Sequence, residues 1–247
     1  MNIFHQLIDL IYPPRCHICQ NFLWKNRANI EQEELHFCKP CLDAFPEITS
    51  PFCPVCRRPF ESLTEEDHIC ENCLRKRPFY DGIGAPYLYE GGIMRAIHQF
   101  KYGRKIYFAG SLSILMATFA RRWLDKEENF LIMPVPLHPK RLRERGFNQS
   151  LILARHVASR NGLELDYLSL RRIRHTQPQT DLNREERRKN IRKAFEVIGQ
   201  TPLKGRTVVL VDDVATTGNT LNECARVLKR AGCDKVYGLV LARTSGN

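Results

Sequence analysis

The sequence lacks any long hydrophobic run. No apolar stretch approaches the ~20 residues that a membrane-spanning helix needs, and residues 1–14 lack the basic start that is typical of a signal peptide. No glycine-rich stretch ends in Gly-Lys-Ser or Gly-Lys-Thr, which excludes a Walker-type phosphate-binding loop. We therefore expect a cytoplasmic protein without a membrane span, in which any phosphate is bound by another kind of loop.

Acidic residues are scarce in the later part of the chain. Residues 1–79 hold nine Lys/Arg and eleven Asp/Glu, a net charge of −2, whereas the remainder holds 29 and 16, a net charge of +13. A basic field of this kind favours polyanionic partners such as nucleotides, pyrophosphate or a nucleic-acid backbone, and it does not choose among them. The length of 247 residues is enough for one large core and a small additional module.

Cysteine, in contrast, is abundant and clustered. Each Cys-x-x-Cys pair can place two thiolates on a tight turn, and two such turns complete a tetrahedral four-cysteine zinc site that is structural and not catalytic. In a reducing compartment this pattern indicates zinc and not disulfides. The two remaining cysteines, Cys224 and Cys233, are predicted to be buried thiols. Eight of the ten cysteines form four such pairs within the first 73 residues: Cys16/Cys19, Cys38/Cys41, Cys53/Cys56 and Cys70/Cys73.

The spacing of the four turns does not fix how they pair. We prefer sequential pairing, which makes two zinc ribbons in tandem, but an interleaved arrangement of first with third and second with fourth also fits. A redox role is disfavoured because no thioredoxin-like strand-helix-strand pattern surrounds the pairs. The basic run before Pro78 marks the expected boundary. We assign residues 1–77 to an N-terminal helix, over residues 3–11, with a double zinc-ribbon module, and residues 78–247 to a second domain.

The second domain is organised around residues 208–220. The first four of these residues are apolar β-formers, as expected for a strand of a parallel sheet that is buried on both faces. The adjacent carboxylates of Asp212 and Asp213 follow, at the point where we expect the strand to end. Thr220 and Glu223 have the spacing of a capping box, which predicts that a helix begins near Thr220.

The loop between this strand and this helix has the composition of an anion site. Free backbone N–H groups, the positive end of the helix dipole and threonine hydroxyls together suit a phosphate. Two neighbouring carboxylates repel an anion, so they need a compensating partner, and a vicinal ribose diol or a bridging divalent cation would serve. The loop therefore predicts a site for a 5-phosphorylated ribose, with an ordinary polar turn as the alternative. Its residues are Ala215, Thr216, Thr217, Gly218, Asn219 and Thr220.

A second strand end is expected beside this loop. Residues 130–135 are apolar, and the carboxyl ends of parallel strands meet at one edge of a sheet. Of the basic residues that follow, Arg143 or Arg145 would pair bidentately with a diphosphate, although each could equally be a solvated surface charge. Lys101 and Arg104 have the same two alternatives, a phosphate ligand or a surface charge.

At residues 208–220 the sequence resembles the type I phosphoribosyltransferases. Their loop for phosphoribosyl pyrophosphate (PRPP) has the same order of apolar strand, acidic pair, small residue, Thr-Thr-Gly and Thr. The resemblance implies an α/β fold with a parallel sheet, in which Asp212 and Asp213 bind the ribose hydroxyls, residues 215–220 hold the 5-phosphate, and Mg²⁺ accompanies PRPP. It also implies a pyrophosphate loop, which we assign to Val135, Pro136, Leu137, Arg143 and Arg145.

The same resemblance implies a flexible loop that closes over PRPP and excludes water. Residues 171–193 carry nine Lys/Arg and three acids and have the expected position for such a loop, followed by a helix from about residue 183. We assign the loop contacts to Arg174, Thr176 and Gln177. The alternative is a solvated basic helix with a polar lead-in.

Over nearly its whole length the chain resembles the ComF family (ComFC/GntX-like). The resemblance consists of the four cysteine pairs, Lys-Tyr-Gly-Arg, Val-Pro-Leu-His with Arg-Gly-Phe-Asn-Gln-Ser, Arg-His-Thr-Gln-Pro-Gln, and the Asp-Asp loop. It implies a part in natural transformation or in the use of external DNA. The partners it suggests are single-stranded DNA and a DNA-uptake helicase.

The enzymatic consequence of the resemblance stays open. Glutamine-using amidophosphoribosyltransferases begin their mature chain with a nucleophilic cysteine, whereas Asn2 stands here, so we expect no glutaminase activity. The first hypothesis is a PRPP-binding protein of DNA uptake. The alternative is an active phosphoribosyltransferase of nucleotide metabolism with an unidentified acceptor, for which no acceptor base is recognisable.

Overall fold

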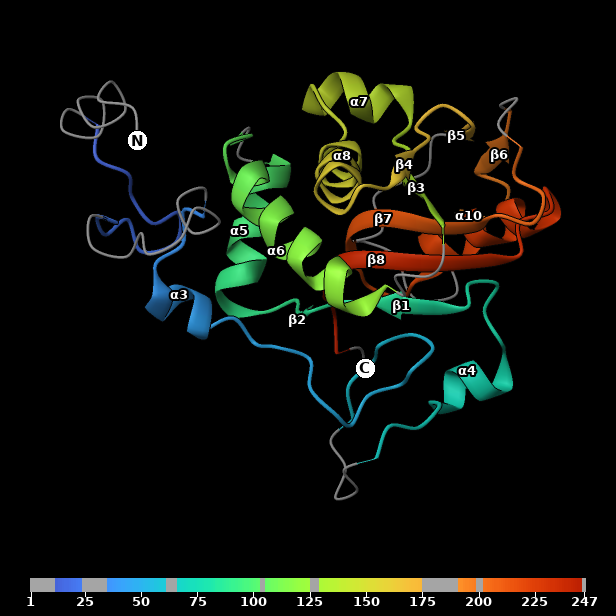
Figure 1. Cartoon of the computed structure of the whole chain (residues 1–247), viewed down its shortest axis with the longest axis horizontal. Coiled ribbons are helices and arrows are strands. Elements are labelled where there is room, and N and C mark those ends of the chain that lie inside the picture. The colour runs from blue at the N-terminus through green and yellow to red at the C-terminus, as the bar shows by residue number, and fades with distance from the viewer. Residues whose placement is uncertain are drawn as a thin grey trace.

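A parallel sheet forms the centre of the computed structural model, which describes residues 12–23, 35–60, 66–102, 105–124, 129–174, 191–198 and 202–245 (Figure 1). The strand order is β1-β8-β7-β3-β4, and β2 also pairs with β8. Every pairing in this sheet is parallel. The strands are β1 (Gly82–Gly84), β2 (Tyr87–Leu88), β3 (Phe130–Pro134), β4 (Glu164–Leu165), β7 (Thr207–Ala215) and β8 (Lys235–Arg243).

Helices cover both faces of the sheet, so the central strands are apolar on both sides. On one face Val209 and Val211 of β7 pack in a cluster with α5 (Gly91–Tyr102), α6 (Phe108–Trp123) and α8 (Gln149–Asn161). On the other face Val208 and Leu210 pack in a second cluster with α10 (Asn219–Arg230). All four of these side chains are fully buried, which explains why β7 begins as an unbroken apolar run.

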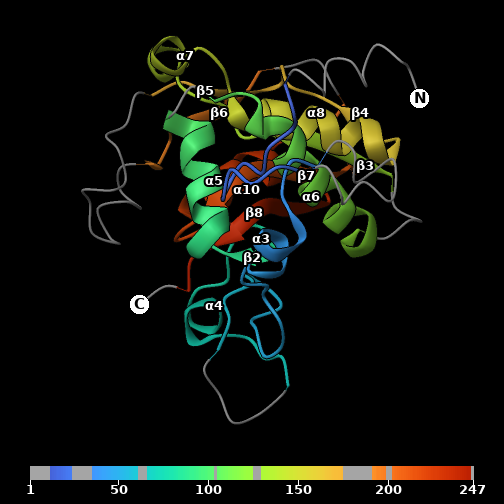
Figure 2. The ribbon, with the colours of Figure 1, turned by 90° about the vertical axis from the view of Figure 1, so that its left-hand side faces the viewer.

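A small unit lies at the upper edge of the sheet in Figures 1 and 2. It contains the antiparallel strands β5 (Leu170–Arg172) and β6 (Phe195–Val197), together with the short helix α7 (Pro139–Arg145). The side chain of His138 accepts a hydrogen bond from the backbone N–H of Lys140 and so caps α7.

The helices α3 (Lys39–Asp43) and α4 (Glu71–Arg75) of the cysteine-rich segment lie toward the opposite edge in both views, whereas its first part runs beside α5 and α6. The segment is joined to the second domain by backbone contacts: the N–H of Ile48 donates to the carbonyl of Pro86, and the N–H of Ile83 donates to the carbonyl of Val55. Glu47 also forms an antiparallel bridge with Tyr87. The zinc-ribbon segment and the sheet therefore share a continuous hydrogen-bonded boundary.

Most elements that the sequence predicts are present. The strand of residues 130–135 is β3, and the buried thiols of Cys224 and Cys233 are confirmed. Outside the described residues lie the predicted helix over residues 3–11, the side chains of Arg104, Thr176 and Gln177, and most of the predicted helix from residue 183. Among the described helices, none combines the length and the apolar character needed to cross a bilayer.

Candidate functional site

The acidic pair lies within β7 and not after it, which corrects the prediction that the strand ends before Asp212. Pairing with β8 continues through Asp212 opposite Val240, and on to Ala215 opposite Arg243. The strand is longer than its apolar run because the neighbouring strand β8 pairs with three of the next four residues. Both carboxylates are therefore held on a rigid strand, which fixes their positions better than a loop would.

Asp213 is paired with a lysine from a different helix. Its Oδ1 lies 2.8 Å from Nζ of Lys101 in α5, and the exposed fractions of the two side chains are 17% for Lys101 and 8% for Asp213. Burial disfavours the ammonium group, but the charges of Asp213 and Asp212 more than offset this and raise the pKa of Lys101. Neither alternative predicted for Lys101 included this role, because sequence spacing does not show that α5 ends beside β7.

Asp212 is held by a hydroxyl from the start of α8. The hydroxyl of Ser150 donates to its Oδ1 at 2.8 Å, and the same oxygen accepts the backbone N–H of Asp213 at 2.9 Å. Burial and the neighbouring charge of Asp213 raise the pKa of Asp212 to about 6, against the opposing effects of Lys101 and Ser150. The compensation that the carboxylates need is thus supplied in part by the protein itself.

The turn after β7 leaves backbone N–H groups available. Among the described residues, the N–H groups of Thr216, Thr217 and Gly218 have no hydrogen-bond acceptor within the chain. Gly218 has φ +74°, and a Cβ there would lie 3.2 Å from the hydroxyl of Tyr80, so the position requires glycine. Together with the N-terminus of α10, these amides form a concave donor site of the kind that binds anions.

The predicted capping box between Thr220 and Glu223 is wrong. Gly218 is the N-cap of α10, without a side-chain capping bond. The carboxylate of Glu223 instead accepts the backbone N–H of Lys193 at 2.6 Å and pairs with Arg226 at 2.6 Å. Glu223 therefore ties the segment before β6 to α10, and the N-terminus of α10 is left for another partner.

The end of β3 lies beside the acidic pair, as predicted. The N–H of Val135 donates to the carbonyl of Val211, the residue directly before Asp212, at 2.9 Å. The side chain of Asn148 donates to the carbonyl of Val135 at 3.3 Å, which connects this turn to the start of α8. Val135 is buried, and the next two residues, Pro136 and Leu137, are half-buried at the rim.

The arginines of α7 occupy different environments. Arg143 is exposed, whereas Arg145 donates to Gln149 at 3.3 Å and to the hydroxyl of Tyr102 at 3.4 Å. Burial and the nearby charge of Arg145 lower the pKa of Arg141. In the same way burial, followed by the charge of Arg141, lowers the pKa of Arg172 to about 10. Three guanidinium groups are therefore close enough to repel one another, and the charge of Asp212 reaches Arg172.

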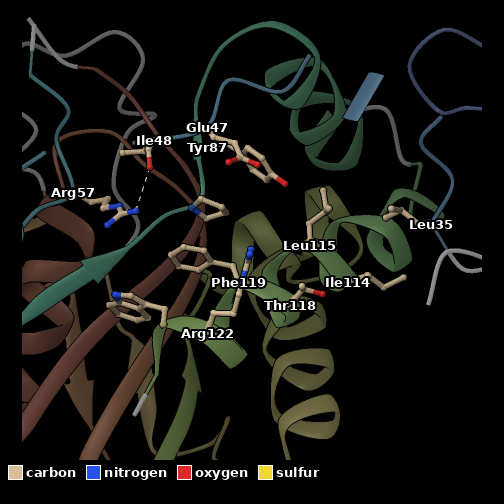
Figure 3. A pocket seen from close by; sticks show the side chains of 12 residues that line it. Leu35, Glu47, Ile48, Arg57, Tyr87, Ile114, Leu115, Thr118, Phe119 and Arg122 are labelled. Carbon is tan, nitrogen blue, oxygen red and sulfur yellow. Dashed lines mark hydrogen bonds between the residues drawn. The ribbon is translucent and has the colours of Figure 1, made fainter. Parts of the chain in front are cut away.

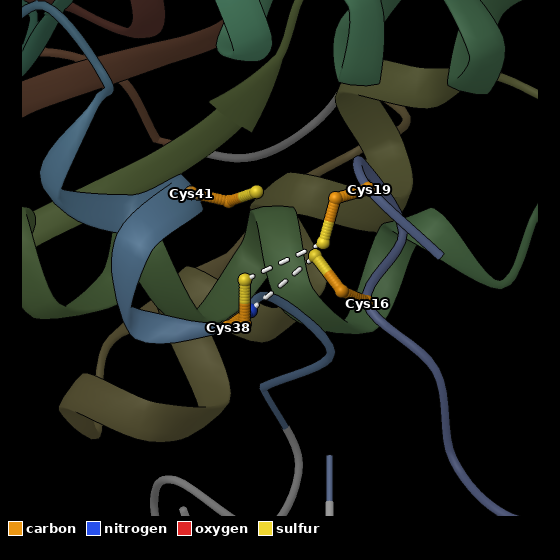
Figure 4. Close-up of side chains that lie close together, drawn as sticks. All are labelled: Cys16, Cys19, Cys38 and Cys41. Atoms are coloured by element: carbon orange, nitrogen blue, oxygen red, sulfur yellow. Dashed lines mark hydrogen bonds between the residues drawn. The ribbon is translucent and has the colours of Figure 1, made fainter. Parts of the chain in front are cut away.

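The eight clustered cysteines form two groups by sequential pairing, which rules out the interleaved alternative. In each group the four sulfur atoms lie within 4.8 Å of one another. Figure 4 shows the first group, in which Sγ of Cys19 and Sγ of Cys38 are 3.6 Å apart. In the second group, Sγ of Cys56 and Sγ of Cys70 are 3.7 Å apart. The groups are Cys16, Cys19, Cys38 and Cys41, and Cys53, Cys56, Cys70 and Cys73.

Both groups fit a structural zinc ion. None of the ten cysteines forms a disulfide bond, and in each group the later pair stands at the start of a single-turn helix, α3 or α4. Burial opposes ionisation of Cys16, but backbone N–H groups directed at its sulfur, including those of Cys38 and Ile18, lower the pKa of this thiol to about 7. The N–H of Cys70 likewise points to Sγ of Cys53 at 3.4 Å. Donors of this kind favour the thiolate, which is the form that binds zinc.

A separate cavity of about 440 Å³ lies between the zinc-ribbon segment and α6 (Figure 3). Its lining includes the rings of Tyr87, Phe119 and Trp123, and the guanidinium of Arg57 donates to the carbonyl of Ile48 at its edge. Neither carboxylate of the acidic pair lines this cavity, so it belongs to the boundary between the two parts of the chain and not to the site at the end of β7.

Sequence reasoning missed four side chains that the structure brings to the site or its support. Ser150 and Arg172 gave no signal because their positions depend on how α8 and β5 pack against β7. Lys101 was recognised as basic but not as the partner of Asp213. Arg243 could have been noticed in the sequence, because it is a charged residue at the end of the apolar run of β8. In the structure its side chain is only 6% exposed, which is unusual for an arginine.

Comparisons with known proteins agree with this arrangement. Residues 7–74 match the model of the double zinc ribbon domain, and residues 148–245 match that of the phosphoribosyl transferase domain. A glutamine PRPP amidotransferase from B. subtilis is similar in structure, with a TM-score of 0.40 and 16% identity over 59% of this chain and 30% of that chain.

The curated relatives cover almost the whole chain. "DNA utilization protein YhgH" of Salmonella typhimurium is 31% identical over 90% of this chain and 96% of its own length. "Competence protein ComFC" of Bacillus subtilis is 28% identical over 92% of this chain and 91% of its own length. The chain therefore belongs to the ComF family of competence and DNA-utilisation proteins, with two four-cysteine zinc-ribbon groups before a phosphoribosyltransferase domain.

Proposed function

We propose that this protein binds PRPP, or a related ribose 5-phosphate ligand, at the end of β7 and acts in DNA uptake or in the use of external DNA. The observation that carries the binding proposal is the turn at residues 216–218, where three backbone N–H groups have no acceptor among the described residues. The DNA-related part is supported by the relatives, which are named as DNA utilization and competence proteins.

The ligand is proposed to extend from the turn toward the acidic pair. Its 5-phosphate would accept the N–H groups of Thr216, Thr217 and Gly218 at the positive end of α10. The ribose hydroxyls would donate to the carboxylates of Asp212 and Asp213, whose alignment is maintained by Ser150 and Lys101. Mg²⁺ bound with PRPP would add positive charge at the same place.

The pyrophosphate end of the ligand is proposed to meet the arginines. Arg141, Arg145 and Arg172 repel one another in the free protein, and a diphosphate between them would remove that repulsion. Val135, Pro136 and Leu137 would supply the rigid backbone on the other side of the diphosphate. The side chain of Arg143 is exposed, so we assign the proposed diphosphate contacts to Arg141 and Arg172 in its place, together with Arg145. Arg174 keeps the proposed loop role.

The same arginines favour a second candidate function, phosphoribosyl transfer. Guanidinium groups beside the ribose site would stabilise departing pyrophosphate, so catalysis would be mainly electrostatic and positional. Release of pyrophosphate from Mg-PRPP in the presence of candidate acceptors distinguishes a transferase from a protein that only binds. No glutaminase activity is proposed, because residues 7–74 match a zinc ribbon where such an activity would need its own domain.

The basic excess of the chain bears on its macromolecular partners. The net charge of +13 after residue 79 supports contact with single-stranded DNA, and we propose a DNA-uptake helicase as the protein partner. The absence of disulfide bonds among the ten cysteines suits the reducing cytoplasm, where such a helicase would meet incoming DNA. DNA affinity carried by phosphate contacts should fall steeply as salt concentration rises.

Isothermal titration calorimetry with Mg-PRPP tests the binding proposal. Wild type should bind, and Asp213→Asn should bind at least about 10-fold more weakly, because a carboxylate that accepts hydroxyl donors is lost. Asp43→Asn is the matched control, since Asp43 is an exposed acid in α3, outside the site. Equal heats from wild type and Asp213→Asn would remove the assignment of the ribose site.

Binding should also depend on pH around the raised pKa of Asp212. Below pH 6 this carboxyl is mainly protonated and accepts fewer hydrogen bonds, so Mg-PRPP affinity should increase as pH rises from 5 to 7. Ser150→Ala should move the midpoint upward, because the hydroxyl that favours the ionised form is gone. Asp212→Asn shows the pH dependence that comes from the ligand's own phosphates. A wild-type profile identical to that of Asp212→Asn would contradict the prediction.

A further inference from the structure

One arginine connects the second cysteine group to the turn that follows β7. Arg243 is the last residue of β8 and is 6% exposed. Its Nε donates to the carbonyl of Cys56 at 2.8 Å, and its Nη1 donates to the carbonyl of Ala215 at 2.9 Å and also to that of Thr216. A single guanidinium group therefore bridges a proposed zinc ligand and the start of the donor turn.

Neighbouring contacts hold the same three segments together. The N–H of Thr244 donates to the carbonyl of Ala215 at 3.2 Å, and its hydroxyl donates to the carbonyl of Thr216 at 3.3 Å. On the other side, Nε of Arg58 donates to the carbonyl of Ser245 at 3.0 Å. Residues 243–245 are therefore fixed between the Cys53–Cys56 turn and the turn after β7.

The two carbonyls bound by Arg243 determine where the next amides point. In a planar trans peptide, the C=O of one residue and the N–H of the following residue point in opposite directions. When Arg243 binds the carbonyls of Ala215 and Thr216, the N–H groups of Thr216 and Thr217 are turned away from Arg243. These are two of the three N–H groups without an acceptor in the described chain.

The first cysteine group has no such connection among the described residues. It forms a small cluster of its own, in which Cys16 and Cys38 pack with Leu23. Its described contacts with the second domain are made by neighbouring residues: the N–H of His36 donates to the hydroxyl of Ser111 in α6 at 2.9 Å, and the ring of His17 packs against that of Phe108 with the centroids 4.5 Å apart. The second group, in contrast, lies in the same core cluster as Val208, Leu210 and α10.

We propose that the second cysteine group, through the bond from Arg243 to the carbonyl of Cys56, orients the amides of Thr216 and Thr217 for anion binding. Arg243 is a positioning residue: its Nε and Nη1 bind backbone carbonyls, and it acts on the proposed phosphate only through the amides that these bonds orient. That the oriented amides receive the phosphate of PRPP rests on the proposed function. Because such coupling is reciprocal, the ligand and the metal of the second group should each strengthen the binding of the other.

Arg243→Lys and Arg243→Gln test the positioning without any ligand. Neither side chain has the fork of donors that reaches three carbonyls in different directions. We expect lower ¹H–¹⁵N heteronuclear NOE values at Thr216 and Thr217, which report greater motion of these amides. Arg206→Lys is the matched control, because Arg206 is a partly buried arginine that pairs with Glu164 at another edge of the sheet. Unchanged NOE values in both Arg243 variants would overturn the proposal.

Mg-PRPP affinity provides the second readout. Loss of a residue that orients metal ligands typically weakens metal binding about 10- to 100-fold. By analogy, we expect the Arg243 variants to bind Mg-PRPP about 10- to 100-fold more weakly than wild type and Arg206→Lys do. If wild type itself binds no Mg-PRPP, the proposed function fails while the NOE result still decides the positioning role. If wild type binds and the Arg243 variants bind equally well, the positioning role is refuted.

A chelator experiment tests the link to the metal with Arg243 intact. In a Cys16→Ser/Cys19→Ser background only the second group can hold zinc, and its release to a chromogenic chelator can be followed at different Mg-PRPP concentrations. Saturating Mg-PRPP should slow this release, whereas zinc release from the first group in the wild-type chain should not change. An unchanged rate at the second group, under conditions where calorimetry shows bound Mg-PRPP, would refute the coupling.

Discussion

Replacing Lys101 by methionine is expected to destabilise the fold by about 3–5 kcal/mol, because it leaves the carboxylate of Asp213 buried without its partner. Nζ of Lys101 lies 2.8 Å from Oδ1 of Asp213, and the side chain of Lys101 is only 17% exposed. The raised pKa of Lys101 means that the ammonium group is stabilised in the folded state. This stability is fully present below the ordinary lysine value of 10.5 and is lost as pH rises through the higher folded value.

Urea unfolding at neutral pH measures the effect of Lys101→Met. Asp213→Asn added to it should recover at least half of the loss, since the remaining partner is then uncharged. Lys39→Met serves as the control: Lys39 pairs with Asp43, but their side chains are 76% and 59% exposed, so the change should be within about 0.5 kcal/mol. A double variant no more stable than Lys101→Met alone would show that the pair is not the cause.

The two cysteine groups should contribute unequally to stability. Loss of zinc from the second group is expected to lower the stability of the chain as a whole, because Cys53, Cys56, Cys70 and Cys73 share a core cluster with β7 and α10. Loss from the first group should have a smaller effect, because its cysteines belong to a separate small cluster and only neighbours such as Phe37 and Ile18 reach the core of α5 and α6. Structural zinc contributes about 10 kcal/mol or more to small zinc modules, which exceeds the stability of many whole domains.

Cys70→Ser and Cys19→Ser provide the comparison between the groups. Metal analysis should find one zinc ion fewer in each variant, and circular dichroism should show a fall in Tm of more than about 10 °C for Cys70→Ser, by the usual relation of ΔΔG to Tm. Cys19→Ser should leave the main unfolding transition nearly unchanged. Equal shifts of that transition in the two variants would contradict the unequal roles.

The sequence predicted the fold well where local pattern and packing agree. The run Val208–Val211 is a central strand because only a strand covered on both faces tolerates four apolar residues in succession. The strand before it, β3, was predicted from an apolar run, and α10 begins one residue before the predicted start at Thr220, although the capping box that suggested this start is not formed. The sequential pairing of the cysteines was preferred on spacing, and the structure confirms it.

The errors arise where a partner from elsewhere in the chain changes a local pattern. Glu223 has capping-box spacing, yet its carboxylate binds Lys193 and Arg226, because the segment before β6 passes over α10. β7 continues past its apolar run because β8 is equally long. Lys101 was expected to be a phosphate ligand or a surface charge, because nothing in its own segment indicates that Asp213 lies beside it. Tertiary contacts of this kind cannot be deduced from spacing alone.

The bond between Arg243 and Cys56 also affects how the protein can be made. The two residues are 187 positions apart, so a ribosome that adds roughly 5–20 residues per second needs about 10–40 s to supply the donor after the acceptor. During that interval the nascent second ribbon can bind its metal but lacks the strand that closes it. The side of the ribbon that later contacts Arg243 would then be accessible to chaperones. Completion of β8 would cover this side and end that accessibility.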